Sequence, residues 1–258
     1  MDPRYGVGYA RLYREHWWWR AREEYLTRLL DRLIGGSDAG ETFDFGCGDG
    51  LFFPILQRYS RQRPRGLETD ASLVDPAGPF ADRITTGALV DDPSEHARYG
   101  LIVALDVLEH LEHPQPAMAI LRARLRPGGW FLATVPAFAE LWTAHDDVNH
   151  HYRRYRLREI ETLVRDSGLE IVESRYFFVW LALVKWLVAR KERVIRPVVK
   201  APETPLAPLN AVALAITRLE QGILRDTHPP FGSSAIVVAR APGLNKFAVN
   251  RVDLVGSS

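Results

Sequence analysis

Phe43-Asp44-Phe45-Gly46-Cys47-Gly48-Asp49-Gly50 decides the fold of this chain. The stretch begins as the end of a short apolar strand and then turns abruptly on three closely spaced glycines. Glycine tolerates positive φ and has no Cβ, so the backbone here can lie directly against a ligand. The residues from Leu51 to Tyr59 predict a helix, whose first amide groups would also be available to that ligand. A strand, a glycine turn and a helix in this order predict a cofactor site.

Two kinds of cofactor site have such a turn. In the dinucleotide-binding pattern G-x-G-x-x-G/A the last small residue lets the helix pack on the strand, whereas this chain has Leu51 there. The spacing of the glycines, with an acidic residue before them, resembles instead the first motif of class I S-adenosylmethionine-dependent methyltransferases. The resemblance implies S-adenosylmethionine as the cofactor, bound by Asp44, Gly46, Cys47, Gly48 and Gly50.

The composition indicates one large globular domain with additions. Of the 258 residues 47% are hydrophobic and 25% are charged, which suffices for a full core. Lys plus Arg number 33 against 32 for Asp plus Glu, so no overall attraction to nucleic acid is expected. The single cysteine, Cys47, excludes an internal disulfide and suits the reducing cytoplasm. We therefore expect a cytoplasmic protein with a small-molecule partner and no nucleic acid.

No targeting or membrane-spanning segment is expected. The first residues are charged and aromatic and lack the apolar stretch of a signal peptide. The longest apolar run, Tyr176 to Ala189, carries Lys185 in its middle and is shorter than the roughly 20 residues that a spanning helix needs.

Alternating strands and helices predict a Rossmann-like, doubly wound α/β sheet. The family topology adds that the sheet has seven strands and is mostly parallel, with the last strand antiparallel between strands 5 and 6. The expected strands are Thr42–Phe45, Pro64–Glu68, Ile84–Leu89, Gly100–Leu105, Trp130–Val135, Leu169–Arg175 and Ser234–Ala239. The expected divisions are a helical cover (1–36), the α/β core (37–176), a helical insertion or lid (177–229), the last core strand (230–241) and a tail (242–258).

An acidic side chain at the end of the second strand, about 20 residues beyond the glycines, is placed to accept both ribose hydroxyl hydrogens. Glu68, followed by Thr69, is the predicted ribose ligand, and Asp70 competes with it. Either acid could instead cap the next helix. Ala88 and Leu89 stand where the family often has an acidic adenine ligand, so backbone amides and apolar contact are expected there.

The segment Asp106-Val107-Leu108-Glu109-His110 follows the strand that ends at Leu105 and resembles a D-V-L-E-H segment of the family. The resemblance places Leu105 and Asp106 beside the methionine part of the cofactor. His110 is a candidate general base, with a structural hydrogen-bonding role as the alternative.

A helix is expected over Tyr5–Ile34. Three consecutive tryptophans, Trp17 to Trp19, cannot all face one side of it, so at least one covers something other than the core. The segment from His16 to Arg22 resembles one subgroup of bacterial methyltransferases that act on small molecules. Trp18 is therefore a candidate substrate-binding residue, and a packing lid is the alternative.

The loop Pro136 to Tyr155 leaves the carboxyl end of strand 5, where ligands bind in open α/β sheets. His145, Asp146, His150 and His151 could ligate a metal, could form a base with its orienting carboxylate, or could cap helices and hold the loop. No familiar zinc spacing is present, and no metal is expected. His145 is the first candidate base, with Asp146 beside it, and the candidate substrate-binding residues of the loop are Trp142, His150, Arg153, Arg154 and Tyr155.

The insertion at 177–229 should form a roof, because it leaves strand 6 at the same edge as the cofactor loops. Two amphipathic stripes could pack on each other, on a twin subunit in a homodimer, or on an apolar substrate. An antiparallel hairpin that closes the site is favoured over membrane association.

The resemblance implies transfer of a methyl group from S-adenosylmethionine to a small molecule. The expected acceptor is a hydroxyl group whose proton a histidine removes. The alternatives are C- or N-methylation of a small or amphiphilic metabolite and a non-catalytic cofactor-binding module. Paired arginines facing the cleft would favour an apolar acceptor with an acidic group.

Overall fold

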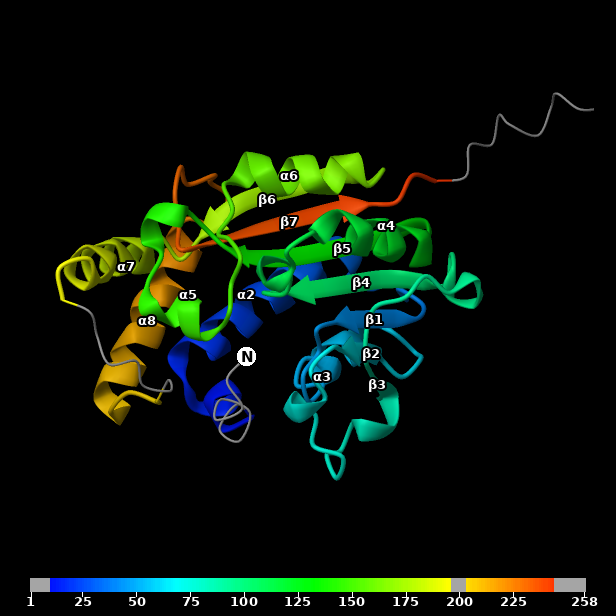
Figure 1. Cartoon of the computed structure of the whole chain (residues 1–258), viewed down its shortest axis with the longest axis horizontal. Helices are drawn as coiled ribbons and strands as arrows, with labels where there is room; N and C mark the ends of the chain where they lie inside the picture. The colour runs from blue at the N-terminus through cyan, green and yellow to red at the C-terminus, as the bar shows by residue number, and fades with distance from the viewer. Residues whose placement is uncertain (1–9, 196–202, 244–258) are drawn as a thin grey trace, which may run out of the picture.

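A computed structural model describes residues 10–195 and 203–243 and has one seven-stranded sheet (Figure 1). The strand order is β3-β2-β1-β4-β5-β7-β6. β7 pairs antiparallel with β5 and β6, and the remaining pairs are parallel. The predicted Rossmann-like topology is therefore confirmed. The strands are β1 (Thr42–Phe45), β2 (Arg65–Glu68), β3 (Ile84–Thr86), β4 (Tyr99–Leu105), β5 (Leu125–Pro136), β6 (Glu170–Phe177) and β7 (Ser234–Arg240).

Helices cover both faces of the sheet, and the central strands alternate their side chains between two cores. Ile102 and Ala104 of β4 pack toward α4 (Pro114–Arg124) and α6 (Leu157–Asp166). Leu101 and Val103 pack toward α2 (Trp17–Ile34) and α3 (Phe53–Leu56) on the opposite face. Burial of both faces explains why β4 is a continuous apolar run rather than an alternating one.

Several expected boundaries move for local reasons. The helix expected over Tyr5–Ile34 is interrupted at His16, whose Nδ1 accepts a hydrogen bond from the Trp18 amide and caps α2; residues 5–9 lie outside the described residues. α3 begins at Phe53 rather than Leu51 because the turn from Gly50 continues to Phe52. β3 ends at Thr86, since Gly87 turns the chain at a φ of 132°.

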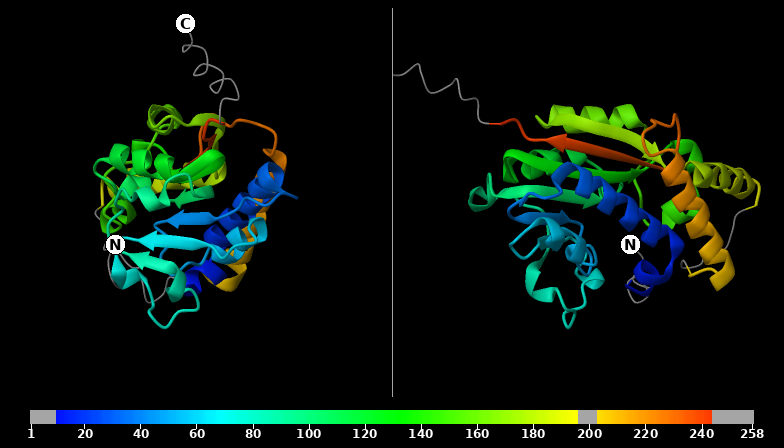
Figure 2. Two further views of the ribbon diagram at one scale, coloured as in Figure 1. Left: turned by 90° about the vertical axis from the view of Figure 1, so that its right-hand side faces the viewer. Right: turned by 180° about the vertical axis from the view of Figure 1, so that it is seen from behind.

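The insertion forms two helices, α7 (Val179–Glu192) and α8 (Ala207–Ile223). Among the described residues, the hydrogen bonds between the two helices lie where α7 begins. The Glu220 carboxylate accepts from the amides of Val179 (2.9 Å) and Trp180 (2.6 Å), and the Thr217 hydroxyl accepts from Trp180 Nε1 at 3.0 Å. α8 otherwise packs along α2, as the rear view of Figure 2 shows, and its Asn210 side chain accepts from the Trp17 amide at 2.8 Å. A simple antiparallel hairpin is thus not what forms, because the buried side of α8 faces α2.

Large apolar side chains of the two insertion helices remain exposed, among them Leu183, Leu187, Leu209, Leu219 and Ile223. The homodimer expected through this insertion stays a prediction. Among the described residues, no helix combines the length and the apolarity that crossing a membrane requires.

Candidate functional site

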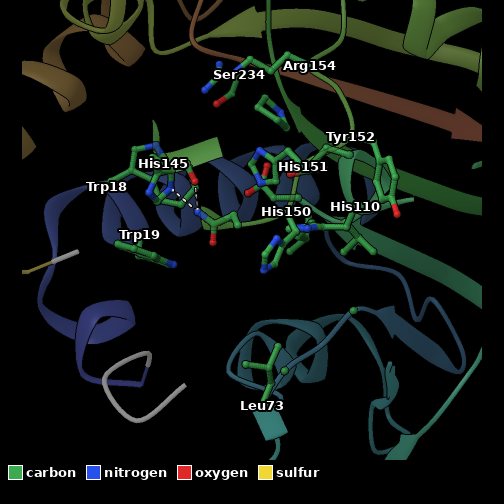
Figure 3. A pocket seen from close by; sticks show the side chains of 18 of the residues that line it. Trp18, Trp19, Leu73, His110, His145, His150, His151, Tyr152, Arg154 and Ser234 are labelled. Atoms are coloured by element: carbon green, nitrogen blue, oxygen red, sulfur yellow. Dashed lines mark hydrogen bonds between the residues drawn. The ribbon is translucent and has the colours of Figure 1, made fainter. Parts of the chain in front are cut away.

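A cavity of about 760 Å³ lies at the carboxyl ends of β1, β2 and β4, between α2 and α7 (Figure 3). Many of the predicted site residues line it: Trp18, Gly46, Cys47, Gly48, Glu68, Thr69, Leu105, Asp106, His110, His145, His150 and Arg154. Eight others do not line it: Asp44, Gly50, Ala88, Leu89, Trp142, Asp146, Arg153 and Tyr155.

The turn at residues 46–50, which we call the glycine cradle, lies at the cavity. Gly46 and Gly48 have different surroundings in it. A Cβ on Gly46 would come within 2.4 Å of the Val107 side chain, so Gly46 allows close packing. A Cβ on Gly48 would meet nothing within 4 Å, and Gly48 has a φ of 51° and lines the cavity. Its backbone is therefore open to a ligand. Cys47 instead lies against Gly66, where an added Cβ would be 2.6 Å from its Sγ, and acts as a small packing residue.

Glu68 closes the other side of the cradle. Its Oε2 accepts from the Gly48 amide at 2.9 Å, and its Oε1 accepts from the Asp70 amide at 2.9 Å. The Thr69 hydroxyl also donates to Oε1, at 3.5 Å. A carboxylate offers about four acceptor positions, so at least one remains for a ribose hydroxyl. The contact with Gly48 also joins the end of β2 to the glycine turn. These residues fit the adenosine part of S-adenosylmethionine.

Asp44 lies beneath this cradle rather than in it. The carboxyl group is buried within β1, and burial raises its pKa to about 8, against the opposing charge of Arg22 and with the Glu68 charge raising it further. The structure places Leu89 against the hydrophobic core instead of the cavity. The adenine contacts assigned to Ala88 and Leu89 remain predictions.

Arg22 is a site residue that sequence reasoning missed. Its Nη2 lies 2.7 Å from Asp106 Oδ2, and the other oxygen of Asp106 accepts from the Thr134 hydroxyl at 3.1 Å. Arg22 is buried, and its guanidinium lies 5.3 Å from the Trp18 ring centroid. Asp106 has a φ of 57°, a strained conformation for a residue other than glycine. Arg22 holds the Asp106 carboxylate at the cavity wall. The one signal in the sequence for Arg22 was its position in the segment from His16 to Arg22 that resembles the methyltransferase subgroup.

The three tryptophans divide as the geometry of a helix requires. All three line the cavity, but Trp17 is largely buried in the core, whereas Trp18 and Trp19 are more exposed to the cavity (Figure 3). The Trp18 and Trp19 rings meet edge to face at 5.1 Å. Trp18 therefore does lie where a ligand can touch it.

Asp146 pairs with His151, five residues later, rather than with its neighbour His145. Its Oδ1 lies 2.9 Å from His151 Nδ1. The local chain explains the pairing: Asn149 caps the end of α5 (Ala144–Val148), and His150 has a φ of 55° that turns the chain back. The His151 amide then donates to the Asp146 carbonyl at 3.1 Å. His151 consequently faces the cavity with its other ring nitrogen.

Arg154 and Asp146 form a buried ion pair that holds the loop. Arg154 Nε and Nη2 lie 2.8 and 3.1 Å from the two carboxylate oxygens, and Nη1 donates to the Ala137 carbonyl at 2.9 Å. Burial acts to raise the pKa of Asp146, but the hydrogen bond from His151 and the charge of Arg154 hold it below its usual value. Asp146 is thus an ionised acceptor, which requires that His151 Nδ1 carry the proton.

The other arginine and the tyrosine of this segment also serve the loop rather than the cavity. Arg153 Nη2 donates to the Glu112 carbonyl at 2.5 Å, and the Tyr155 hydroxyl donates to the Leu108 carbonyl at 3.1 Å. Trp142 Nε1 donates to Asp147 at 2.8 Å. The expected pair of arginines facing an acidic acceptor is therefore not present, because both guanidinium groups already have partners.

Two further cavity histidines, His110 and His145, are kept neutral. Burial lowers the pKa of His110 to about 4, with the neighbouring His151 adding to the effect. The ring of His145 is accessible through the cavity yet surrounded by protein, and burial lowers its pKa to about 4. Asn149 Nδ2 lies 3.1 Å from His145 Nε2.

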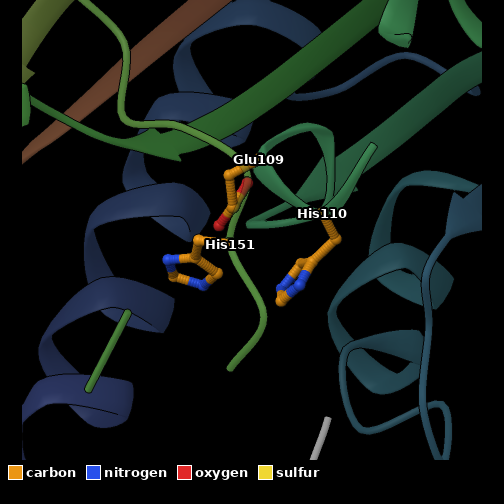
Figure 4. Close-up of side chains that lie close together, drawn as sticks. All are labelled: Glu109, His110 and His151. Atoms are coloured by element: carbon orange, nitrogen blue, oxygen red, sulfur yellow. The ribbon is translucent and has the colours of Figure 1, made fainter. Parts of the chain in front are cut away.

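Glu109, His110 and His151 come together at the cavity floor (Figure 4). One potential ligand atom of each lies within 4.8 Å of the others. Glu109 is 1% exposed, and burial together with the charge of Asp106 raises its pKa well above the usual value. This set could hold a metal ion, and it differs from the four loop residues first considered.

Lys185 is a second residue that sequence reasoning did not assign to the site. It projects from α7 among the cavity-lining residues Leu181 and Val188. Burial lowers its pKa to about 8, assisted by the charge of Arg154 and opposed by Asp146 and Asp106. The apolar run from Tyr176 to Ala189 is interrupted by a lysine because that position faces the cavity.

Comparisons with known proteins agree with this fold. Residues 18–174 match the sequence model of a family described as a methyltransferase domain. A probable S-adenosylmethionine-dependent methyltransferase of Mycolicibacterium smegmatis is 27% identical over 236 residues, which cover 87% of this chain and 90% of that protein. A ubiquinone biosynthesis O-methyltransferase of Leptothrix cholodnii is 21% identical over 210 residues, which cover 67% of this chain and 86% of that protein.

The solved structure of phosphoethanolamine N-methyltransferase 2 from Haemonchus contortus, in complex with S-adenosyl-L-methionine, has the same fold. Its TM-score is 0.53 at 16% identity, and the match covers 85% of this chain and 52% of that one. Together with the family match, which spans more than half of the chain, the glycine cradle and Glu68 lead to one conclusion. This chain belongs to the class I S-adenosylmethionine-dependent methyltransferases.

Proposed function

We propose that this enzyme methylates a hydroxyl oxygen of a small molecule, and that His151 receives the hydroxyl proton. The observation that carries the proposal is the pairing of His151 with Asp146 at 2.9 Å in the cavity that also contains the glycine cradle. An ionised carboxylate fixes the ring tautomer, so Nε2 presents a lone pair. The names of several relatives, which are O-methyltransferases, support oxygen as the methylated atom.

The chain's own residues position the reaction. Gly48 and Glu68 would hold the adenosine part of the cofactor, and Asp106, fixed by Arg22, lies near the wall where its methionine part is expected. The cofactor supplies an electrophilic methyl group on a sulfonium. In the transfer the carbon–sulfur bond breaks as the carbon–oxygen bond forms, and the hydroxyl proton passes to His151 Nε2. Proximity and exclusion of water by α7 supply much of the acceleration.

The acceptor that we propose is largely apolar and carries one acidic group. Apolar side chains of Trp18, Trp19, Leu181 and Val188 line the cavity. The arginines expected to bind an acidic group are engaged elsewhere, but Lys185 brings an amine to the cavity from α7. An ammonium group in a poorly hydrated cavity favours an anionic partner.

Two histidine variants test the assignment of the base. We expect His151→Ala to lower kcat by about 10²–10⁴-fold on a hydroxyl acceptor. His145→Ala, which changes the other candidate base in the same cavity, should have a much smaller effect. Turnover would be followed by mass spectrometry with a panel of phenols and aliphatic alcohols, with and without a carboxylate. Cofactor binding would be measured by calorimetry, and both variants should retain it.

Three results would contradict the proposal. His151→Ala could turn over like the wild type, which would exclude His151 as the proton acceptor. The products could carry the new methyl on carbon or nitrogen, which would replace O-methylation by one of the alternatives. The wild type could bind the cofactor and methylate no member of the panel, as a non-catalytic binding module would.

A further inference from the structure

The cluster of Glu109, His110 and His151 is the strongest unexplained feature of the cavity. Glu109 and His110 belong to the short turn Leu108–His110 after β4, and His151 comes from the loop after α5. The backbone joins the two segments, since the Tyr152 amide donates to the Glu109 carbonyl at 2.8 Å. The rings of His110 and His151 meet edge to face, with centroids 4.6 Å apart. Two segments distant in sequence thus bring two imidazoles and a carboxyl group to one point.

Glu109 has a polar atom without a protein partner. Its side chain is 1% exposed, and Oε2 has no hydrogen bond to any of the described residues. A buried oxygen in this state destabilises the fold unless something else binds it. The cavity, which Glu109 lines, is where that partner would come from.

His151 has the arrangement of a metal-binding histidine. Its Nδ1–H donates to the Asp146 carboxylate, which leaves the Nε2 lone pair directed at the cluster. Metal-ligating histidines almost always donate their other ring N–H to a carboxylate or carbonyl, which fixes the ring and raises its basicity. His110 adds a second neutral imidazole, since a neutral ring is the form that binds metal.

We propose that Glu109, His110 and His151 bind one divalent cation of the imidazole-preferring kind, such as Zn²⁺. Two histidines and one carboxylate leave coordination positions open toward the cavity, as sites that act on a substrate do. In the tetrahedral arrangement typical of Zn²⁺, ligand atoms about 2.1 Å from the cation lie about 3.4 Å apart. The ligand atoms of the cluster lie within 4.8 Å of one another, so side-chain rotations must bring them closer when the cation binds.

This inference rests on the proposed O-methylation, and in the cation-bound enzyme it replaces His151 by water as the acceptor of the hydroxyl proton. The cation would bind the acceptor's hydroxyl oxygen and lower its pKa, so that the O–H bond breaks more easily. The proton would then pass to water, because the cation would occupy the Nε2 lone pair of His151. The oxygen would form its bond to the methyl carbon as the carbon–sulfur bond breaks.

Metal binding by the full chain tests the site directly. Titration of metal-free protein with ZnCl₂ in a calorimeter should show one site per chain. Glu109→Gln and His110→Ala should weaken binding by at least about 10-fold, since each removes one ligand. His145→Ala changes a cavity histidine outside the cluster and should bind Zn²⁺ like the wild type. Co²⁺ should give visible absorption bands in the wild type that Glu109→Gln loses, and circular dichroism would confirm that each variant is folded.

The inference is overturned if folded wild type binds no stoichiometric Zn²⁺ or Co²⁺, or if Glu109→Gln binds them equally well. An intense thiolate band with Co²⁺ would place the cation at Cys47 and would also overturn it. Activity separates this inference from the proposed function. Methylation of a hydroxyl that persists in a chelator but is lost in His151→Ala leaves the function standing and excludes the cation.

Discussion

Lys185 determines, in our interpretation, which acceptors bind. Its amine has a pKa of about 8, so it is charged at pH 7 and largely neutral at pH 9. The KM for an acceptor with a carboxylate should therefore rise by about 10-fold over this range, as a charge-assisted hydrogen bond is lost. Steady-state kinetics at pH 7, 8 and 9 would measure this rise.

Two substitutions at this position serve as controls. Lys185→Met should have the high KM at every pH, and Lys185→Arg, whose guanidinium stays charged, should keep a low KM at pH 9. Equal pH dependence in wild type and Lys185→Met would assign the effect to another group and remove Lys185 from acceptor recognition.

Asp44 should make the fold less stable as the pH rises. Its pKa is about 8 in the folded protein and near the ordinary 3.8 when unfolded. Between these values the unfolded chain has released a proton that the folded chain retains. The stabilising contribution is complete below pH 3.8 and is lost as the pH rises to 8, at on the order of 1 kcal/mol per pH unit.

Asp44→Asn has nearly the same shape and no proton to lose. The Tm of this variant, measured without cofactor, should gain on that of the wild type from pH 5 to pH 8 and then keep a constant lead. A difference in Tm that does not change with pH would show that Asp44 is ionised in the folded protein.

The residues of the site show where sequence reasoning stops. Glu68 and Gly48 could be predicted because strand, turn and acid follow one another along the chain. The partner of Asp146 could not be, since His145 and His151 are both close in sequence and only the turn at His150 selects between them. The basic side chains could not be assigned for the same reason. Arg154 is paired with the Asp146 carboxylate, whereas Lys185 lines the cavity, and the sequence does not show which basic side chain has a carboxylate partner.

At the scale of elements, α7 depends on α8 for its first turn. The Glu220 carboxylate accepts from two amides at the start of α7, where it satisfies backbone donors and complements the helix dipole. Glu220→Ala should lower the stability of α7 by about 1–2 kcal/mol. Hydrogen exchange should then become faster over Val179–Glu192 while α2 remains protected.

Arg218→Ala is the matched control on the same helix. Arg218 forms an exposed ion pair with Glu24, and such pairs contribute little to stability. It should leave exchange in α7 unchanged. Equal acceleration in the two variants would mean that α7 depends on the general packing of α8 and not on this carboxylate.

The elements themselves were predictable to different degrees. Strands that carry long apolar runs, such as β4 and β7, appear where the pattern indicates, because burial on both faces leaves no other position for them. The pattern also predicted α7 and α8 as amphipathic helices. It could not tell which face of α8 packs along α2. The buried residues of α8 are Leu214, Thr217 and Gln221, whereas its apolar stripe, which includes Leu209, Leu219 and Ile223, is exposed.

For the whole molecule, the sheet topology brings the site together. The turn at 46–50, Glu68 and Asp106 follow three different strands whose carboxyl ends meet at one edge. The sequence predicted this assembly because parallel connections leave little freedom of handedness. The histidine loop and the insertion reach the same edge, and their side-chain pairings depend on contacts between segments that no local pattern encodes.

The attachment of α7 has a consequence for the entry and release of ligands. Glu220 holds the beginning of the helix, and near its other end the Glu192 carboxylate accepts from the Ala144 amide at 2.8 Å. Because α7 is held near both ends, it cannot rotate away from the cavity about either end. Exchange of acceptor and product must therefore wait for one fastening to open, and the one at Glu192 joins α7 to the very segment that carries the histidines. Departure of product and loosening of the histidine loop would then be a single event.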